Sequence, residues 1–265
     1  MNIKESLRKI LELSGYTIHK APPTIENVSP AGWRPVYDQD GLWTIHNHDF
    51  MLDSHFRKAY ERGTLAAKAD YEFHWRVHVG LWAAFSASKL KGDFVECGVN
   101  RGFMSSAIME YLNWDSLNKT FYLMDTFKGL DERFVSKEEF NDGILERNGR
   151  LLESGFYTTN AEAVGQNFSQ WKHIQIVVGT IPETLTAVTT PEIAFLHLDM
   201  NCVPPEIAAF HHFWDRLVPG ALILLDDYAY KGGELQKAAM DDAAAAKNVK
   251  FLSLPTGQGL LVKPD

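Results

Sequence analysis

Cysteine and long apolar runs are scarce in this chain. Only Cys97 and Cys202 are cysteines among 265 residues, which is too few for a disulfide framework, and no CxxC spacing offers a structural zinc site. No apolar run reaches the ~18 residues of a membrane-spanning helix, and the first residues lack the apolar stretch of a secretory signal. The sequence therefore predicts a protein of a reducing compartment, the cytoplasm, without a membrane partner.

Basic residues are also fewer than acidic ones. The chain has 26 basic against 34 acidic residues, which gives a formal net charge of -8. A surface that binds nucleic acid needs a basic face, so we expect no nucleic-acid partner. The remaining composition is ordinary for a globular protein, with 45% hydrophobic and 23% charged residues. This is enough apolar material for a complete core and excludes wholesale disorder.

The N-terminal part of the chain has weak periodicity. Residues 2–14 show the apolar spacing of a short helix, whereas residues 16–49 show none and contain four prolines among several aromatic residues. Because an aromatic segment of this length is typical of a binding segment or lid, we expect it to pack against the main domain. We therefore predict an N-terminal helical cap segment, 1–65, that lies over the active site, followed by the main domain, 66–265.

The stretch after this segment carries conflicting signals. Residues 53–62 have helical character and predict a helix that ends at Gly63. Residues 71–79 alternate apolar with polar as a strand does, but the alanine-rich residues on either side favour a helix. We predict one long helix over residues 64–91.

From Gly92 onward, short apolar runs alternate with helical segments. This alternation predicts an α/β fold with a seven-stranded, mostly parallel sheet and helices on both faces. The last two runs are too close together for a crossover helix, so they predict an antiparallel C-terminal hairpin. The predicted strands are 93–97, 120–125, 174–178, 192–199, 221–226, 249–254 and 259–263, and the predicted helices are 103–113, 160–170, 204–217 and 233–247.

Acidic residues stand at the ends of three predicted strands. Asp125, Asp199 and the pair Asp226-Asp227 each follow an apolar run. An aspartate at such a position often only caps the next turn. However, the carboxyl ends of parallel strands form the ligand-binding edge of an open sheet. Three strands that end this way at one edge favour a functional site.

The loop after the first predicted strand of this sheet has the character of a ligand-binding turn. It reads Glu96-Cys-Gly98-Val-Asn100-Arg-Gly102 and precedes a helix, whose N-terminus attracts negative charge. The dinucleotide pattern GxGxxG would need glycines where Asn100 and Phe103 stand. Asp125 lies on the next strand, at the place where an acid accepts hydrogen bonds from ribose hydroxyls. Together these residues predict a site for an adenosine-containing cofactor, with Asn100 and Thr126 among its contacts and with Phe127 either flanking the adenosine or filling the core.

Five motifs now carry a resemblance to a known family. In chain order they are Gly92-Asp-Phe-Val-Glu-Cys-Gly-Val, Met124-Asp-Thr-Phe-Lys-Gly-Leu, Val178-Gly-Thr-Ile-Pro-Glu-Thr-Leu, Leu198-Asp and Leu224-Leu-Asp-Asp-Tyr. Over residues 90–265 the chain resembles the macrocin O-methyltransferase family. These are class I enzymes with a Rossmann-like fold that use S-adenosylmethionine to methylate sugar hydroxyls of natural products.

The resemblance implies a role for each matching position. Glu96, Gly98 and Gly102 would line the methionine end of the cofactor, Asp125 would hold its ribose, and Gly179 and Thr180 would border the adenine. Asp199, Asp226 and Asp227 would bind magnesium, with Asp199 also acting as general base. The chain departs from the family at Asn100, where a bulky residue is usual, at Phe103, where the family has a glycine, and over residues 200–205, which face the acceptor.

The metal assignment has a chemical basis of its own. Magnesium prefers carboxylate oxygens and keeps positions for water or substrate, and it stabilises an alkoxide or phenolate as it forms. Neighbouring residues on a strand point to opposite faces. Asp226 and Asp227 can therefore reach one ion only if the chain has left the strand by Asp227.

Three further residues are candidates to touch the methyl acceptor. His46 and His48 lie in the aromatic N-terminal segment, and Gln258 stands between two glycines of the C-terminal hairpin. We predict an S-adenosylmethionine-dependent O-methyltransferase that acts on a hydroxyl of a small sugar-like or natural-product-like molecule, assisted by magnesium. Two alternatives remain at this point: a nicotinamide-dependent oxidoreductase on a similar sheet, and a cofactor-binding module without catalysis. The sequence also leaves a homo-oligomer open.

Overall fold

The computed structural model of the chain describes residues 34–265. Within them a small unit, residues 34–37 and 43–47, is distinct from a main unit that holds residues 38–42 and 48–265. The helix expected at residues 2–14 lies outside the described residues. Two short strands, β1 (Tyr37–Gln39) and β2 (Leu42–Thr44), pair with each other. Among the described helices, none combines the length and apolar composition needed to cross a membrane.

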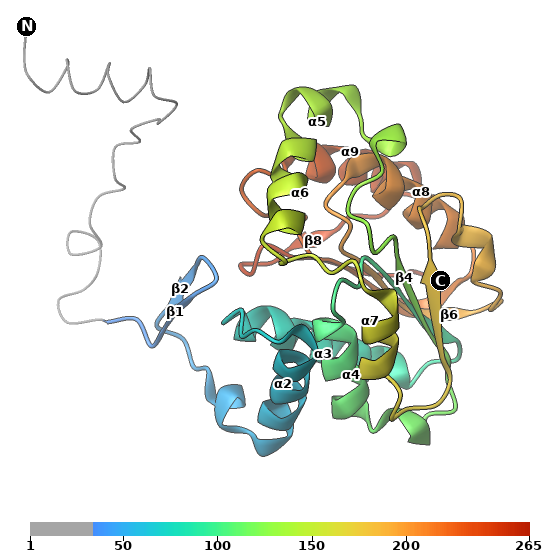
Figure 1. Ribbon diagram of the computed structural model, residues 1–265. Helices are drawn as coiled ribbons and strands as arrows, with labels where there is room; N and C mark the ends of the chain where they lie inside the picture. Colours follow the sequence, from blue (N-terminus) through green and yellow to red (C-terminus); the bar gives the residue numbers. More distant parts are fainter. Residues whose placement is uncertain (1–33) are drawn as a thin grey trace, which may run out of the picture. The chain divides into compact units, whose positions relative to one another are not determined.

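The main unit is built on a seven-stranded sheet with the order β5-β4-β3-β6-β7-β9-β8 (Figure 1). All neighbours pair in parallel except β9, which runs antiparallel to both β7 and β8. The predicted sheet and its antiparallel hairpin are therefore confirmed. The strands are β3 (Asp93–Cys97), β4 (Phe121–Asp125), β5 (Ile174–Val178), β6 (Ile193–Leu198), β7 (Leu217–Leu225), β8 (Leu252–Ser253) and β9 (Gly259–Val262).

Two hydrophobic cores cover the two faces of this sheet. On one face Phe94 and Leu123 pack with α2 (Ser54–Ala67), α3 (His74–Ser88) and α4 (Phe103–Leu112). On the other face Val95 and Met124 pack with α8 (Val203–Trp214) and α9 (Glu234–Ala246). Because side chains alternate along each strand, strands buried on both faces consist almost entirely of apolar residues. Polar side chains inside these strands are therefore exceptions that need an explanation.

The chain before β3 differs from the prediction. We expected a helix that ends at Gly63 and a second, continuous one over 64–91. Instead α2 runs through Gly63 to Ala67, and a turn separates it from α3, which starts at His74. Lys68 and Glu72 adopt left-handed backbone conformations in this turn, which ends the first helix. The strand-like alternation of residues 71–79 came from this turn and the start of α3. The predicted boundary between residues 65 and 66 falls within α2.

A long insertion separates β4 from β5. It contains the short helices η4 (Glu132–Phe134), α5 (Lys137–Asn141), α6 (Ile144–Glu153) and α7 (Ala161–Asn167), of which the last matches the helix expected near 160–170.

Elsewhere the observed element boundaries differ little from the predicted ones: β7 starts four residues earlier than predicted, and the strand expected at 249–254 shrinks to two residues. Three further 3-10 turns, η2 (Asp49–Leu52), η3 (Trp114–Ser116) and η5 (Leu185–Ala187), complete the described elements.

Gly63 explains why α2 and α4 approach each other so closely. A Cβ atom built at Gly63 would lie 2.5 Å from the ring of Phe103, whereas one at Gly149 in the middle of α6 would meet nothing within 4 Å. We therefore expect Gly63→Ala to lower the free energy of unfolding by about 1–3 kcal/mol through overpacking. Gly149→Ala is the matched control and should raise it by about 0.5–1 kcal/mol, because alanine has the higher helix propensity. Urea unfolding of the two variants checks this, and equal effects in both would contradict the packing argument.

Candidate active site at the carboxyl edge of the sheet

The backbone of the sheet brings the predicted acidic residues to one edge. The amide of Asp199 donates to the Cys97 carbonyl at 2.8 Å, and the amide of Asp226 donates to the Leu198 carbonyl at 3.0 Å. These bonds continue the ladders β3–β6 and β6–β7 just past the ends of the strands. The carboxylates that follow β6 and β7 therefore have to lie next to the loop that follows β3.

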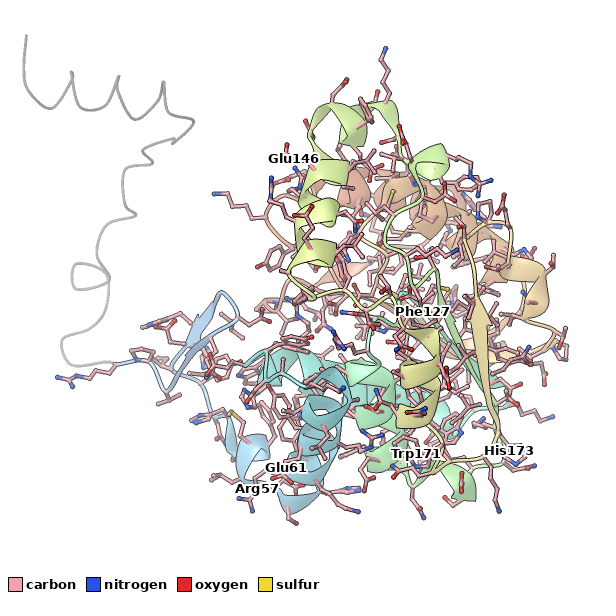
Figure 2. The ribbon with its side chains drawn as sticks, in the orientation of Figure 1. Arg57, Glu61, Phe127, Glu146, Trp171 and His173 are labelled. Carbon is pink, nitrogen blue, oxygen red and sulfur yellow. The ribbon has the colours of Figure 1, made fainter. Side chains whose placement is uncertain are left out.

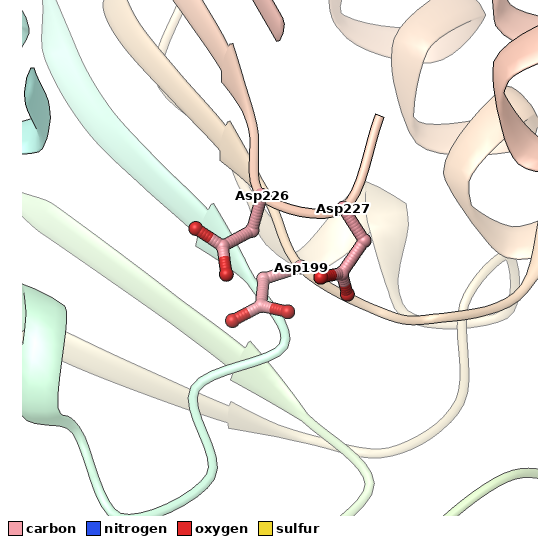
Figure 3. Close-up of side chains that lie close together, drawn as sticks. All are labelled: Asp199, Asp226 and Asp227. Atoms are coloured by element: carbon pink, nitrogen blue, oxygen red, sulfur yellow. The ribbon is translucent and has the colours of Figure 1, made fainter. Parts of the chain in front are cut away.

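Asp199, Asp226 and Asp227 form a cluster of three carboxylates. One oxygen of each lies within 4.8 Å of an oxygen of the others, and Figure 3 shows the three side chains pointing toward one another. β7 ends at Leu225, so Asp226 and Asp227 lie in the bend beyond the strand. This removes the geometric objection that neighbouring strand residues point to opposite faces. The expected convergence of the three side chains is thus present in the structure.

Sequence reasoning missed the cation of this cluster, Arg76 of α3. Its Nη1 donates to Asp226 Oδ2 at 2.7 Å and lies 3.6 Å from Asp227 Oδ1. Its Nε and Nη2 form a pair of bonds to the carboxylate of Asp40, both at 3.1 Å. The only signal in the sequence is an arginine within an apolar helix, next to Val77 and two turns before the alanines that face the core.

Burial and mutual repulsion set the protonation of the cluster. Burial, together with the charges of Asp226 and Asp227, raises the pKa of Asp199 well above its usual range. Burial and the charge of Asp226 raise the pKa of Asp227 to about 6, against the opposing effect of Arg76. Burial alone would also raise the pKa of Asp226. Arg76 and His197 outweigh this effect and hold the pKa of Asp226 below its usual range. Clustered carboxylates resist simultaneous ionisation, so the group favours a further cation.

Two buried residues, Gln258 and His197, lie next to the carboxylate of Asp226. Gln258 is fully buried and its Nε2 donates to Asp226 Oδ1 at 3.1 Å. Gln258, which the sequence predicted to touch the methyl acceptor, instead supports a carboxylate and is not part of the cavity lining. His197 Nδ1 lies 3.0 Å from Glu96 Oε1, and its Nε2 lies 3.8 Å from Asp226 Oδ1. Burial lowers the pKa of His197, but the carboxylates of Asp226 and Glu96 outweigh it and raise the pKa to about 10.

A cavity of about 500 Å³ opens over this edge of the sheet. Most of the residues predicted to bind the cofactor line it, as do all three clustered aspartates. These lining residues are Glu96, Gly98, Asn100, Asp125, Thr126, Gly179, Thr180, Asp199, Asp226 and Asp227. The volume lies within the ~300–1,000 Å³ that is common for small-molecule sites.

Gly98 is required by the protein backbone itself. Its φ is +92°, and a Cβ atom built there would lie 1.9 Å from the carbonyl oxygen of Asp199. A side chain at this position would therefore displace the strand end that carries Asp199. Valine at position 98 would therefore disturb the fold and not cofactor binding alone.

Asp125 lies at the end of β4 and already has partners. Its Oδ2 accepts hydrogen bonds from the amides of Val99 and Asn100, both at 2.8 Å, and its Oδ1 accepts one from Phe127 at 2.7 Å. The carboxylate thus fixes the loop after β3 while lining the cavity. Each oxygen has two lone pairs, so Oδ1 retains the capacity to accept from a ligand hydroxyl.

Two of the predicted cofactor contacts pack inside the protein. Phe127 belongs to the hydrophobic core and is 3% exposed; its position in the middle of the domain is labelled in Figure 2. Gly102 precedes α4 with a φ of +81°, and a Cβ there would lie 2.5 Å from the ring of Phe168. Neither residue lines the cavity, so Phe127 takes the core position that the sequence left open.

The two candidate histidines differ in their setting. His48 is half-buried, precedes η2 in the main unit and is not part of the cavity lining. His46 is exposed and belongs to the small unit, where its amide donates to Thr44 Oγ1 at 3.0 Å. Their contact with substrate stays a prediction.

Glu206 of α8 is a buried acid beneath the cluster. Its Oε1 accepts from the Met200 amide at 3.2 Å and from Gln236 Nε2 at 3.0 Å. Burial and the charge of Asp227 raise the pKa of Glu206 from 4.5 to about 8. Because the folded protein binds this proton more tightly than the unfolded chain, its stability falls as the pH rises from about 4.5 to about 8.

Replacing Glu206 by Gln should remove this loss of stability. The amide oxygen can keep both hydrogen bonds and stays neutral, so Glu206→Gln should gain in Tm over the wild type as the pH rises from 5 to 8, with no further gain above 8. Each pKa unit corresponds to about 1.4 kcal/mol. Thermal melts at pH 5.5, 7 and 8.5 check this, with Glu146→Gln on the exposed face of α6 as control (Figure 2). A difference in Tm that is the same at every pH would contradict the prediction.

The sequence is similar to a known protein family and to a curated relative. The family model of the macrocin O-methyltransferases (TylF) matches residues 81–251. A curated relative from Streptomyces olivaceus, 8-demethyl-8-(2,3-dimethoxy-alpha-L-rhamnosyl)-tetracenomycin-C 4'-O-methyltransferase, is 27% identical over 150 residues, which cover 54% of this chain and 55% of the relative. The chain thus spans about half the length of this relative.

Solved structures show the same architecture. The O-methyltransferase NovP has a TM-score of 0.61 at 17% identity, over 72% of this chain and 80% of NovP. The calicheamicin methyltransferase CalS11 has a TM-score of 0.52 at 16% identity, over 71% of this chain and 78% of CalS11. At these identities the similarity shows the class I methyltransferase fold alone. Since the family model covers well over half of the sequence and includes all the strand ends that carry the acidic residues, the chain belongs to the macrocin O-methyltransferase family.

Proposed function

We propose that this protein is an S-adenosylmethionine-dependent O-methyltransferase that acts on a hydroxyl group of a sugar or a similar natural product, assisted by Mg²⁺. The observation that carries the proposal is one cavity lined both by the loop after β3 with Asp125 and by the cluster of Asp199, Asp226 and Asp227. One part of this cavity suits an adenosine-containing cofactor, and the other suits a metal and an acceptor. The matched family supports the same activity.

The residues of the cavity fit S-adenosylmethionine. Glu96 is 2% exposed, lines the cavity, and its Oε2 has no hydrogen-bond partner among residues 34–265. A buried carboxylate oxygen without a partner is costly, and the ammonium of the methionine part can supply one. Asp125 can accept from a ribose hydroxyl, and Gly179, whose amide bonds to the Asp125 carbonyl, lines the cavity together with Thr180. When bound, the cofactor supplies the methyl group.

The three carboxylates fit Mg²⁺ by the chemistry of their donor atoms. Magnesium prefers carboxylate oxygens and usually binds through a few carboxylates together with water or substrate. Asp226 is held by Arg76 and Gln258, whereas within residues 34–265 the carboxylate of Asp199 makes only a long contact of 3.4 Å with Asn201 Nδ2. Asp199 and Asp227 would therefore be the more available ligands. The ion would supply positive charge beside the acceptor hydroxyl.

In this proposal Asp199 accepts the proton of the acceptor hydroxyl. Methyl transfer forms a bond between the acceptor oxygen and the methyl carbon, breaks the bond from that carbon to sulfur, and releases the hydroxyl proton. Asp199 lines the cavity and lies directly beside the loop after β3. A carboxylate at this position can take the proton while it helps to align the acceptor oxygen with the methyl group.

The first test addresses the cofactor. Asp125→Asn keeps one acceptor oxygen for the amides of Val99 and Asn100, but its NH₂ group cannot accept from the Phe127 amide and the charge that strengthens a bond to the ribose is lost. We expect S-adenosylmethionine to bind the wild type in calorimetry and to bind Asp125→Asn at least tenfold more weakly, because a hydrogen bond to a charged group contributes roughly 1.5–3 kcal/mol. If the wild type bound NADH and not S-adenosylmethionine, the oxidoreductase alternative would replace this proposal.

The second test addresses the metal and the base. Asp199→Asn should lower methyl transfer by ~10²–10⁴ with cofactor affinity nearly unchanged, since it removes a positioned base and one metal ligand. Asp227→Asn should weaken Mg²⁺ binding, measured by calorimetry with MgCl₂, and recover activity at high Mg²⁺. The control is Asp241→Asn, because Asp241 pairs with Lys237 outside the cluster. Full wild-type activity in excess chelator would refute the role of the metal.

A further inference from the structure

Asn100 has an unexpected function in the structure. Its Nδ2 donates to the Phe156 carbonyl at 3.1 Å, and its Oδ1 accepts from the Thr158 amide at 3.0 Å. The side chain thus bonds to the residues on both sides of Tyr157, which belongs to the insertion between β4 and β5. Arg101 adds a third bond, from Nη2 to the Gly155 carbonyl at 2.8 Å. The loop after β3 therefore holds residues 155–158 in place.

This attachment places Tyr157 in the cavity. Tyr157 lines the cavity together with Asp125 and Asp199. Its phenol oxygen lies within electrostatic range of the carboxylates of Asp199, Asp227 and Asp125. Its hydroxyl has no hydrogen-bond partner within the described part of the chain, residues 34–265. Tyr157 is half-buried and lines the cavity, so a hydroxyl without a partner there is available to a ligand.

The position of this hydroxyl indicates which part of the ligand it meets. In the proposed function the ribose is held at Asp125 and the methyl group is delivered to an oxygen at Asp199. The sulfonium group has to lie between these two carboxylates, because it joins the ribose to the methyl group. Tyr157 lines the same cavity as both of them. Hydrogens on a carbon bound to positively charged sulfur are polarised and can form C–H···O contacts with an oxygen.

We propose that Tyr157, positioned by Asn100, contacts the sulfonium-bound methyl group of the cofactor through its hydroxyl oxygen. This inference rests on the proposed function, because it needs S-adenosylmethionine in the cavity. Tyr157 is then a residue that touches the cofactor, and Asn100 is a positioning residue that acts through it. An asparagine at this position can bond both sides of Tyr157, because its amide carries both a donor and an acceptor.

The experiment compares two ligands that differ in the methyl group and its charge. Calorimetry measures the Kd of S-adenosylmethionine and of S-adenosylhomocysteine for the wild type and for Tyr157→Phe, which keeps the ring. We expect Tyr157→Phe to weaken S-adenosylmethionine roughly two- to fivefold and to leave S-adenosylhomocysteine unchanged. With ¹³C-methyl S-adenosylmethionine, the proton resonance of the bound methyl group should move upfield in the variant, because the C–H···O contact is lost.

Two further variants make the test specific. Tyr71→Phe removes the hydroxyl of another cavity-lining tyrosine, one with Arg101 as its charged neighbour, and it should leave the ratio of the two Kd values unchanged. Asn100 has a φ of +48°, which glycine adopts readily, so Asn100→Gly removes both side-chain bonds without backbone strain. It should raise the Kd of S-adenosylmethionine relative to that of S-adenosylhomocysteine as Tyr157→Phe does, and the double variant should resemble either single one.

The outcomes separate the two proposals. If the wild type binds neither ligand, the proposed function fails. If the wild type binds both and Tyr157→Phe changes neither the ratio nor the methyl resonance, the contact with the methyl group is wrong and the proposed function stands. Equal weakening of both ligands by Tyr157→Phe would also overturn it, because it would place the hydroxyl on a part that the two ligands share. Additive effects of Asn100→Gly and Tyr157→Phe would overturn the positioning role of Asn100.

Discussion

The close approach of two backbones at Gly98 is the constraint on which the site depends. The carbonyl of Asp199 occupies the space that any side chain at position 98 would need, while the Asp199 amide bonds to Cys97. The end of β6 therefore has a fixed place beside the loop after β3. Through the bond from the Asp226 amide to Leu198, the end of β7 is fixed to β6 in turn. A loop that suits a cofactor and a cluster that suits a metal are thus parts of one rigid edge.

The same edge of the sheet carries three clustered carboxylates, and neighbouring side chains stabilise the charge of one of them more than that of the other two. Arg76 and Gln258 hold Asp226 by hydrogen bonds, and Arg76 together with His197 keeps it ionised, whereas Asp199 and Asp227 line the cavity with raised pKa values. One carboxylate is therefore a fixed anion, and the other two gain stability when a cation arrives. Asp40 shares Arg76 with Asp226. It ties the turn between β1 and β2 to the charge balance of the cluster, although it is far from the aspartates in the sequence.

The sequence was sufficient for the features that depend on local pattern. Apolar runs located the strands, and the rule that ligands bind at the carboxyl ends of parallel strands located Asp125, Asp199, Asp226 and Asp227. Two kinds of feature escaped it. The break between α2 and α3 depends on left-handed turn residues, Lys68 and Glu72, which have no strong preference for that conformation. The partners of Arg76, 36 and 150 positions away, depend on tertiary packing, and no periodicity reports on such contacts.

Asn100 links the loop after β3 to a distant part of the chain through the two ends of its amide. From the sequence it was a residue that tolerates a left-handed backbone beside a ligand, and its φ of +48° agrees with this. The two bonds of its amide reach residues 56 and 58 positions away, which requires a group with both a donor and an acceptor. A bulky apolar side chain could only pack against this loop, whereas an amide also sets its register and hence the direction of the side chain between the bonds. The identity of this one residue therefore connects the cofactor loop to the insertion that borders the cavity.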